Sequence, residues 1–216
     1  AMIKRKVDYA KFSGLKGVGE NAIENIIEER TKHGPYTSIF DLAKRVNHRA
    51  ANKKSLESLI LSGAFDCFTD ISRAQYFHQV PGESPMLDKI LKFGSIFQSQ
   101  NATASNTLFG DLQMPDIVPP KILPCEPWPL ITQLDFEKDV TGMYMSGHPL
   151  DNFKFEMKHY NITPLSEYVE FKSDIQNNPN PAKQFRVAGL VIDAQHRLTK
   201  TGKNFGILTI EDYSGK

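Results

Sequence analysis

The sequence predicts a mainly α-helical protein that ends in a short β segment. Apolar residues recur three and four positions apart over residues 20–62 and again beyond residue 130, which is typical of amphipathic helices. Six prolines from Pro115 to Pro129 exclude a helix there and favour an extended connector. From Phe185 onward the apolar residues alternate, which predicts two β-strands joined by a turn at Lys200 to Lys203.

Start and stop signals define the first three helices. The first follows Gly19 and runs to about Lys32, where Gly34-Pro35 ends it, and its inward face carries Ile23, Ile26 and Ile27. Ser38, with Asp41 three residues later, resembles a capping box that opens a second helix. A third helix follows the capping residue Asn52 and stops at Gly63, where a left-handed C-cap is expected.

The chain is expected to divide into four segments. A helical domain, with further helices over residues 73–79 and 86–100, leads into a polar and proline-rich linker. A helical connector interrupted at "SGHPL" follows, and the strands come last. The expected bounds of the four segments are 1–101, 102–130, 131–182 and 183–216.

The composition is that of a folded protein, with 40% hydrophobic and 24% charged residues. Cys67 and Cys125 stand at neither metal-ligand nor redox-motif spacing, so we expect two free thiols in a reducing cytoplasm. No apolar run approaches the ~20 residues that cross a bilayer, and no membrane partner is expected. Ala1 before Met2 and the end of the sequence inside a strand-like segment predict an excised fragment.

The net charge of +1 conceals an asymmetry along the chain. Residues 1–54 hold twelve Lys and Arg against six Asp and Glu, residues 55–151 hold five against twelve, and the remainder holds nine against seven. An anionic ligand is therefore expected near either end of the chain. The alternative is that the charges simply cover solvated faces.

Two glycines stand one residue apart immediately before the first helix, in the stretch Lys16-Gly17-Val18-Gly19. Without Cβ atoms, such a turn brings backbone N–H groups close to an anion, and the helix N-terminus adds its own unpaired N–H groups and positive dipole end. An ordinary structural turn is the alternative. A dinucleotide-binding fingerprint is excluded because the third glycine is missing, and a P-loop because no Gly-Lys-Ser/Thr follows.

The residues around the glycines resemble a helix-hairpin-helix motif. Leu15 precedes Gly-Val-Gly, and Ala22, Ile23, Ile26 and Ile27 follow before Arg30. The resemblance implies that the hairpin packs against the phosphates of one DNA strand without reading bases. The implied contacts are Lys16, Gly17, Val18, Gly19 and Asn21. The acidic side chains of the following helix must then face away from the duplex.

Four blocks in order resemble the C-terminal part of the α subunits of bacterial DNA polymerase III. They are "GLKGVGENAIENIIEERTKHGPYTSIFDLAKRV", "NKKSLESLILSGAFD", "EKDVTGMYMSGHPLD" and "RVAGLV" with "TKTGKNFGILTIEDYSG". The resemblance implies a helical domain that binds duplex DNA and the sliding clamp, followed by the start of an oligonucleotide-binding (OB) β-barrel. Other replicase subunits are further implied partners.

The resemblance also implies where catalysis is absent. The polymerase chemistry of that family uses paired palm aspartates that hold two Mg²⁺ ions, and no segment here resembles that palm. Asp135, Glu137 and Asp139 alternate as ligands could, but their spacing within a helix predicts a solvated acidic face. We therefore expect a fragment without catalytic residues, cofactor or metal.

Further candidate contacts lie in three places. Leu108-Phe109 matches the apolar pair of a clamp-binding peptide, although Ser105 replaces the usual glutamine, and the alternative is that the pair pins the linker to its own domain. Cations of a second hairpin could contact duplex DNA, or form a solvated loop: Arg49, Lys53 and Lys54. Near the end of the chain, cations and an aromatic ring could meet single-stranded DNA: Arg197, Lys200, Lys203 and Phe205. Two strands cannot close a barrel, so an exposed strand edge is expected.

Two other functions are compatible with the hairpin. Base-excision glycosylases use the same motif with a catalytic aspartate about twenty residues downstream, near the position of Asp41, although a capping role also fits Asp41. A protein-interaction scaffold would bind a clamp or subunit without affinity for duplex DNA. The leading hypothesis is a non-catalytic, DNA-binding and clamp-tethering segment of a replicative polymerase.

Overall fold

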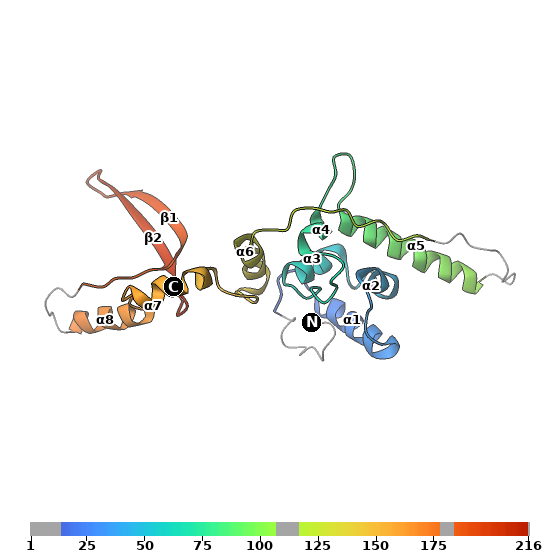
Figure 1. The fold of residues 1–216 in the computed structure, drawn as a ribbon, viewed down its shortest axis with the longest axis horizontal. Helices are drawn as coiled ribbons and strands as arrows, with labels where there is room; N and C mark the ends of the chain where they lie inside the picture. The colour runs from blue at the N-terminus through green and yellow to red at the C-terminus, as the bar shows by residue number, and fades with distance from the viewer. Residues whose placement is uncertain (1–13, 107–116, 178–183, 216) are drawn as a thin grey trace. The chain divides into compact units, whose positions relative to one another are not determined.

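The computed structural model describes residues 14–106, 117–177 and 184–215 (Figure 1). The chain forms two compact units, Ala1–Ser146 and Gly147–Lys216. The boundary between the two units lies inside the helical connector expected over residues 131–182, because the helix that follows the proline-rich stretch belongs to the N-terminal unit. None of the helices in the described ranges is long and apolar enough to cross a membrane.

The N-terminal unit contains six helices within the described residues. Their bounds are α1 (Glu20–His33), α2 (Ile39–Arg45), α3 (Lys53–Leu61), α4 (Arg73–Phe77), α5 (Met86–Asn106) and α6 (Leu130–Thr141). The predicted mainly helical architecture is confirmed. Helix α5 continues to Asn106 and therefore includes the first residues of the linker that the sequence placed at 102–130.

The predicted capping residues act at the helix ends. Ser38 Oγ accepts a hydrogen bond from the Asp41 N–H (3.1 Å), and Asn52 Oδ1 accepts one from the Ser55 N–H (3.0 Å). Asp41 reaches one residue farther back than a capping box requires, since its carboxylate accepts from the Thr37 N–H at 2.9 Å. Ser38 and Asn52 each satisfy a first-turn N–H that the helix itself leaves unpaired, and Asp41 holds the residue before the cap.

The core of the N-terminal unit lies among these helices. Helix α2 packs along α5, and α3 contacts α4, α5 and α6. The crossing of α2 and α5 depends on Gly94, because a Cβ there would lie 2.2 Å from the Ala43 carbonyl oxygen. Buried side chains of the helices join one apolar cluster that also includes Leu15 and Val18 from the hairpin before α1.

The extended segment over residues 117–129 is attached to the helices in its middle and at its C-terminal end. The Trp128 ring stacks on Phe77 of α4 and contacts Phe136 of α6, with ring centroids 5.5 and 4.7 Å apart. Gln75 Nε2 donates a hydrogen bond to the Leu123 carbonyl (2.9 Å). These contacts join α6 to the unit that contains the hairpin.

The C-terminal unit combines short helices with one antiparallel β-hairpin. The elements are the 3₁₀ helix η2 (Pro149–Phe153), α7 (Lys154–His159), α8 (Leu165–Asn177), β1 (Leu190–Leu198) and β2 (Asn204–Glu211). The predicted pair of strands is confirmed, and Gly202 takes a positive φ of 80° in the connecting turn. Two strands form the whole sheet within the described residues, and no barrel is present there.

The "SGHPLD" and "EDYSG" stretches contact each other inside the C-terminal unit. Tyr213 Oη donates to Asp151 Oδ1 (3.0 Å), and the Tyr213 ring lies against His148 with centroids 4.4 Å apart. Asp212 accepts a hydrogen bond from the Leu165 N–H at the start of α8 (2.8 Å). Both stretches therefore serve to fasten the end of β2 to η2 and α8.

Candidate nucleic-acid interface

The hairpin before α1 presents its glycines on the surface and its apolar residues to the core. Leu15 and Val18 are 6% and 8% exposed, whereas Lys16, Gly17 and Gly19 are exposed. Val18 was expected to contact DNA, but its side chain is buried and its N–H donates to the Leu15 carbonyl (3.2 Å). Its role in the hairpin is that of an anchor.

The two glycines have different roles. Gly17 has φ of 82°, and a Cβ there would lie 3.1 Å from Ser58 Oγ and 3.3 Å from Lys54 Cε, both on α3. Ser55 Oγ of the same helix donates to the Gly17 carbonyl (3.2 Å). Gly19 has an ordinary φ of −76° and open space where a Cβ would stand. Gly17 is therefore needed for contact with α3, and Gly19 keeps the surface open.

Backbone N–H groups of the hairpin divide into bonded and open sets. The Lys16 N–H donates to the Val140 carbonyl of α6 (2.9 Å), and the Ala22 N–H donates to the Gly19 carbonyl (3.0 Å). Within the described ranges, the N–H groups of Gly17, Gly19 and Glu20 have no hydrogen-bond acceptor. The open groups lie at the N-terminus of a 14-residue helix, where the dipole favours an anion.

Two lysines before and within α3, Lys44 and Lys53, already have partners within the unit. Lys44 lies over the rings of Phe93 and Phe97, at 5.3 and 4.5 Å from their centroids. Lys53 Nζ lies 2.7 Å from an Asp88 carboxylate oxygen, and this hydrogen bond raises the pKa of Lys53. Lys53 was an expected DNA contact, but its ammonium group is already paired.

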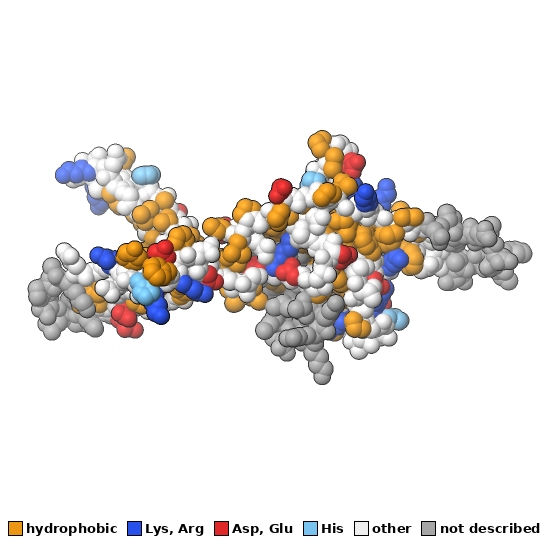
Figure 2. Space-filling view, viewed as in Figure 1, with side chains coloured by type: hydrophobic (Ala, Val, Ile, Leu, Met, Phe, Trp, Pro, Cys, Tyr) orange, Lys and Arg blue, Asp and Glu red, His pale blue; other side chains and the backbone are white. Residues whose placement is uncertain are grey.

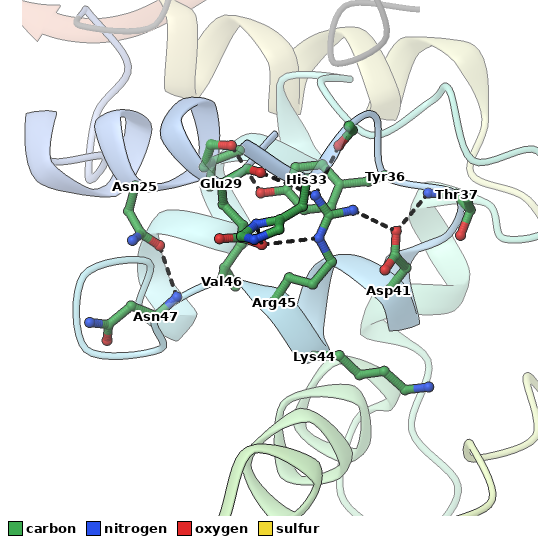
Figure 3. A network of polar contacts seen from close by, with 12 residues as sticks. Asn25, Glu29, His33, Tyr36, Thr37, Asp41, Lys44, Arg45, Val46 and Asn47 are labelled. Carbon is green, nitrogen blue, oxygen red and sulfur yellow. Dashed lines mark hydrogen bonds and ion pairs between the residues drawn. The ribbon is translucent and has the colours of Figure 1, made fainter. Parts of the chain in front are cut away.

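Arg45 joins α1 to α2 (Figure 3). Its guanidinium donates to Glu29 Oε1 (3.2 Å), Asp41 Oδ2 (3.1 Å) and the carbonyl of Gly34 (2.9 Å). The same group lies 4.4 Å from the centroid of the Tyr36 ring. Arg45 is 17% exposed and fully engaged, so it fixes the angle between the helices.

The engagement of Asp41 bears on the glycosylase alternative. Its carboxylate accepts from the Thr37 N–H and from Arg45 of the same helix α2, as Figure 3 shows. A carboxylate in this double role is held at the helix start. The position therefore favours the capping role over that of a catalytic base.

Lys16, Lys54 and Arg49 remain exposed, and the described part of the chain offers them no ion pair. The Lys54 stem lies against Gly17, as the Cβ distances above show. This places a lysine of α3 next to the open N–H groups at the start of α1.

The second hairpin, residues 47–52, uses most of its own N–H groups. The Arg49 N–H donates to the Asn47 side chain (2.9 Å), and the N–H groups of Ala50 and Ala51 donate to the Asn47 carbonyl (3.1 and 2.8 Å). Asn47 in turn donates its N–H to Asn25 of α1 (2.8 Å; Figure 3). This hairpin therefore offers an anion chiefly the Arg49 side chain.

The predicted acidic face of α6 is wrong at one position. Asp135 and Asp139 are exposed, but Glu137 is 0% exposed. Burial raises its pKa, and hydrogen bonds from Ser146 and Arg73 outweigh that effect, so the net shift in the pKa of Glu137 is downward. The helical period predicted the face of Asp135 and Asp139, but a buried cationic partner 64 residues away decides the environment of Glu137.

The remaining candidate residues belong to other parts of the chain. Leu108 and Phe109 lie outside the described residues. Arg197 and Phe205 are register partners across β1 and β2, and Lys200 and Lys203 occupy the turn between the strands. Figure 2 shows Lys and Arg side chains gathered at the end of the β1–β2 hairpin that carries this turn. The Arg197 guanidinium also donates to Gln195 Oε1 at 2.8 and 3.1 Å.

Sequence reasoning missed Ser55 and Ser58 of α3, which contact the first glycine. Both are buried, at 2% and 6% exposed, although serines are usually solvated. Their spacing on the inward face of α3, next to Leu56 and Leu59, was the available signal. Small side chains there permit the close approach of the Gly17 backbone.

The hairpin packs on the next helices through its apolar residues and is open at its glycines, which is the arrangement of two helices joined by a glycine turn. The family described as the helix-hairpin-helix motif matches residues 5–76, which includes the hairpin and α1 to α3. The chain is thus mainly helical, contains a helix-hairpin-helix motif, and ends in a two-stranded antiparallel sheet.

Longer relatives match almost the whole chain. DNA polymerase III subunit alpha of Escherichia coli K12 is 34% identical over 206 residues, or 95% of this chain. The corresponding subunits of Vibrio cholerae and Thermus aquaticus are 32% and 28% identical over 95% and 94% of it. The chain is homologous to a segment of DNA polymerase III subunit alpha and spans about 16% of the length of the E. coli protein.

Proposed function

We propose that this segment binds duplex DNA through phosphate contacts of the hairpin before α1, as part of a replicative polymerase. The observation that carries the proposal is that the N–H groups of three exposed residues, Gly17, Gly19 and Glu20, have no acceptor among the described residues. They lie at a helix N-terminus beside the Lys54 stem and the exposed Lys16. Amides and lysines in this arrangement suit a phosphate group.

The proposed contacts carry no sequence information. Backbone N–H groups and lysines bind phosphate oxygens, which every base pair presents alike. Arg49 on the second hairpin would add a further phosphate contact. We therefore expect affinity that depends steeply on salt and little on DNA sequence.

Fluorescence anisotropy on two unrelated duplexes at two salt concentrations tests the proposal. The double variant Lys16→Ala with Lys54→Ala should lower the affinity for both duplexes by the same factor. It should also reduce the slope of log affinity against log salt by about 2, since each phosphate contact contributes close to one unit. The matched control is Lys92→Ala with Lys121→Ala, which removes the same charge from two exposed lysines elsewhere in the unit.

Three results would count against the proposal. One is a wild-type protein that does not bind duplex DNA. Another is binding that distinguishes the two sequences or ignores salt. The third is an equal loss of affinity in the two double variants, which would indicate a general charge effect with no contribution specific to the hairpin.

We also propose that Leu108 and Phe109 bind a bacterial sliding clamp. The support is the sequence itself, in which two adjacent apolar residues stand between polar ones. A peptide spanning residues 102–112 should bind the clamp in titration calorimetry, and Leu108→Ala with Phe109→Ala should abolish the signal. A wild-type peptide without measurable heat of binding would remove this proposal.

The proposal assigns no catalytic step, metal or cofactor to this segment. The relatives are named as polymerase subunits, and this chain spans only a small part of their length. We further propose that the β1–β2 turn binds single-stranded DNA. Other replicase subunits are proposed partners, and the proposed location is the cytoplasm. Incubation with oligonucleotides that carry damaged bases distinguishes the DNA-binding proposal from the glycosylase alternative, because a glycosylase would release the base or cleave the strand.

A further inference from the structure

Helix α6 makes a direct hydrogen bond to the proposed phosphate-binding hairpin. The Lys16 N–H donates to the Val140 carbonyl (2.9 Å), a group in the last turn of α6 that the helix cannot satisfy itself. The Val140 side chain is 9% exposed and belongs to the same apolar cluster as Leu15 and Val18. The residue immediately before Gly17 is therefore held by a helix more than a hundred residues later in the chain.

The position of α6 depends in turn on Glu137. Its buried carboxylate accepts from Arg73 Nη1 (2.6 Å), from the N–H groups of Met145 (3.0 Å) and Ser146 (2.8 Å), and from Ser146 Oγ. Arg73 begins α4 and also donates to Asp66. The carboxylate thus fastens α6 and the residues after it to the body of the N-terminal unit.

We propose that Glu137 is a positioning residue for the DNA-binding hairpin, acting through α6 and the Lys16–Val140 hydrogen bond. This inference rests on the proposed function of that hairpin. Contacts to a phosphate require donor groups held to within a fraction of an ångström. The Val140 carbonyl sets the orientation of the peptide group at Lys16, from which the chain enters Gly17. The working DNA-binding unit then extends beyond the matched motif, residues 5–76, to include residues 130–146.

The sign of the charge change separates positioning from electrostatics. Glu137→Gln removes one negative charge, which by itself would strengthen binding to a polyanion. Asp139→Asn makes the same chemical change on the exposed face of the same helix. A loss of affinity in the first variant that is absent from the second therefore has a geometric cause.

The experiment has one arm without DNA and one with it. In the ¹⁵N-labelled full chain, hydrogen exchange at the Lys16 N–H reports the bond to Val140 directly. We expect that exchange to accelerate at least about tenfold in Glu137→Gln relative to wild type and Asp139→Asn. Duplex affinity by anisotropy should fall by about three- to tenfold in Glu137→Gln only, the range usual for residues that act through others.

Each outcome decides something. Unchanged Lys16 exchange in Glu137→Gln overturns the inference whether or not DNA binds. Faster exchange with unchanged affinity, in a wild type that binds duplex DNA, overturns it as well. A wild type that binds no duplex DNA overturns the proposed function, and with it the effect claimed on affinity, while the exchange arm still shows whether Glu137 holds Lys16.

A milder variant covers the case in which Glu137→Gln does not fold. Ser146→Ala removes one hydroxyl donor to Glu137 and leaves the Arg73 ion pair in place. We expect the same direction of change at smaller size, with the Lys16 N–H exchanging faster and duplex affinity lower than in wild type. A folded Ser146→Ala protein with wild-type exchange at Lys16 would contradict the inference.

Discussion

Arg73 Nη1 and Glu137 Oε1 lie 2.6 Å apart, although 64 residues separate the two in the chain. Arg73 is 7% exposed and Glu137 is 0% exposed, so the ion pair is removed from water. A Cβ at Gly63 would lie 2.2 Å from Arg73 Nη2, so a larger residue there would displace the guanidinium. The pair connects α4, at the edge of the motif, to α6 beyond the proline-rich segment.

Loss of one member of this pair should destabilise the N-terminal unit strongly. Glu137→Ala leaves the Arg73 charge buried with Asp66 alone, and we expect a loss of about 3–5 kcal/mol in the free energy of unfolding. Asp139→Ala, on the exposed face of α6, should change it by less than about 0.5 kcal/mol. Urea unfolding followed by circular dichroism measures both, and similar values for the two variants would show that the ion pair does not hold α6.

Substitutions of the two hairpin glycines should affect the stability of the fold differently. Gly17→Ala places a Cβ at positive φ and 3.1 Å from Ser58, and should cost about 1–3 kcal/mol of stability. Gly19→Asn introduces a preferred N-cap residue into open space, so stability should stay within about 0.5 kcal/mol of wild type.

Duplex affinity should nevertheless fall in Gly19→Asn, because the Asn side chain accepts first-turn N–H groups and covers the surface offered to a phosphate. Thermal unfolding and anisotropy on the same preparations provide the comparison. A Gly19→Asn protein with wild-type affinity would show that phosphate does not approach at Gly19.

Acid should loosen the C-terminal unit through Asp151. The hydrogen bond from the His148 N–H is the largest influence and, with Lys154 and Tyr213, lowers the pKa of Asp151 from 3.8 to about 2. A group with a depressed pKa in the folded state stabilises the fold above pH 3.8 and loses that contribution as the pH falls towards 2. Carboxylate titration by NMR should place the Asp151 midpoint near the lower value. Asp151→Asn should remove this part of the acid sensitivity, and a midpoint near 3.8 would contradict the assignment.

The turn between β1 and β2 offers a test of single-strand binding that does not involve the hairpin before α1. Lys200→Glu with Lys203→Glu reverses two exposed charges near Phe205 in the sequence. The double variant should lower the affinity for a single-stranded oligonucleotide by about tenfold or more. Duplex affinity should change little in comparison. The matched control is Lys158→Glu with Lys172→Glu, two exposed lysines on α7 and α8. Equal losses in the two double variants would remove the turn as a specific site.

Local signals were sufficient for much of the fold. Helices α1 to α3 begin and end close to the predicted residues, because their caps at Ser38, Asn52 and Gly63 act within a few residues of themselves. The strands and their turn followed from the change in apolar period at Phe185. The polar residues of the linker gave no sign that α5 continues to Asn106, since small polar side chains neither require a helix nor exclude one.

By itself the sequence determined that a glycine hairpin precedes an amphipathic helix, and that cations concentrate in the same part of the chain. Only the tertiary structure decided which of those groups stay open. Lys53 is paired with Asp88, Gly17 is turned towards Ser58, and Glu137 is buried against Arg73. The reason is physical: helical period and capping depend on neighbours a few residues away, whereas pairing and burial depend on helices that meet only when the chain has folded.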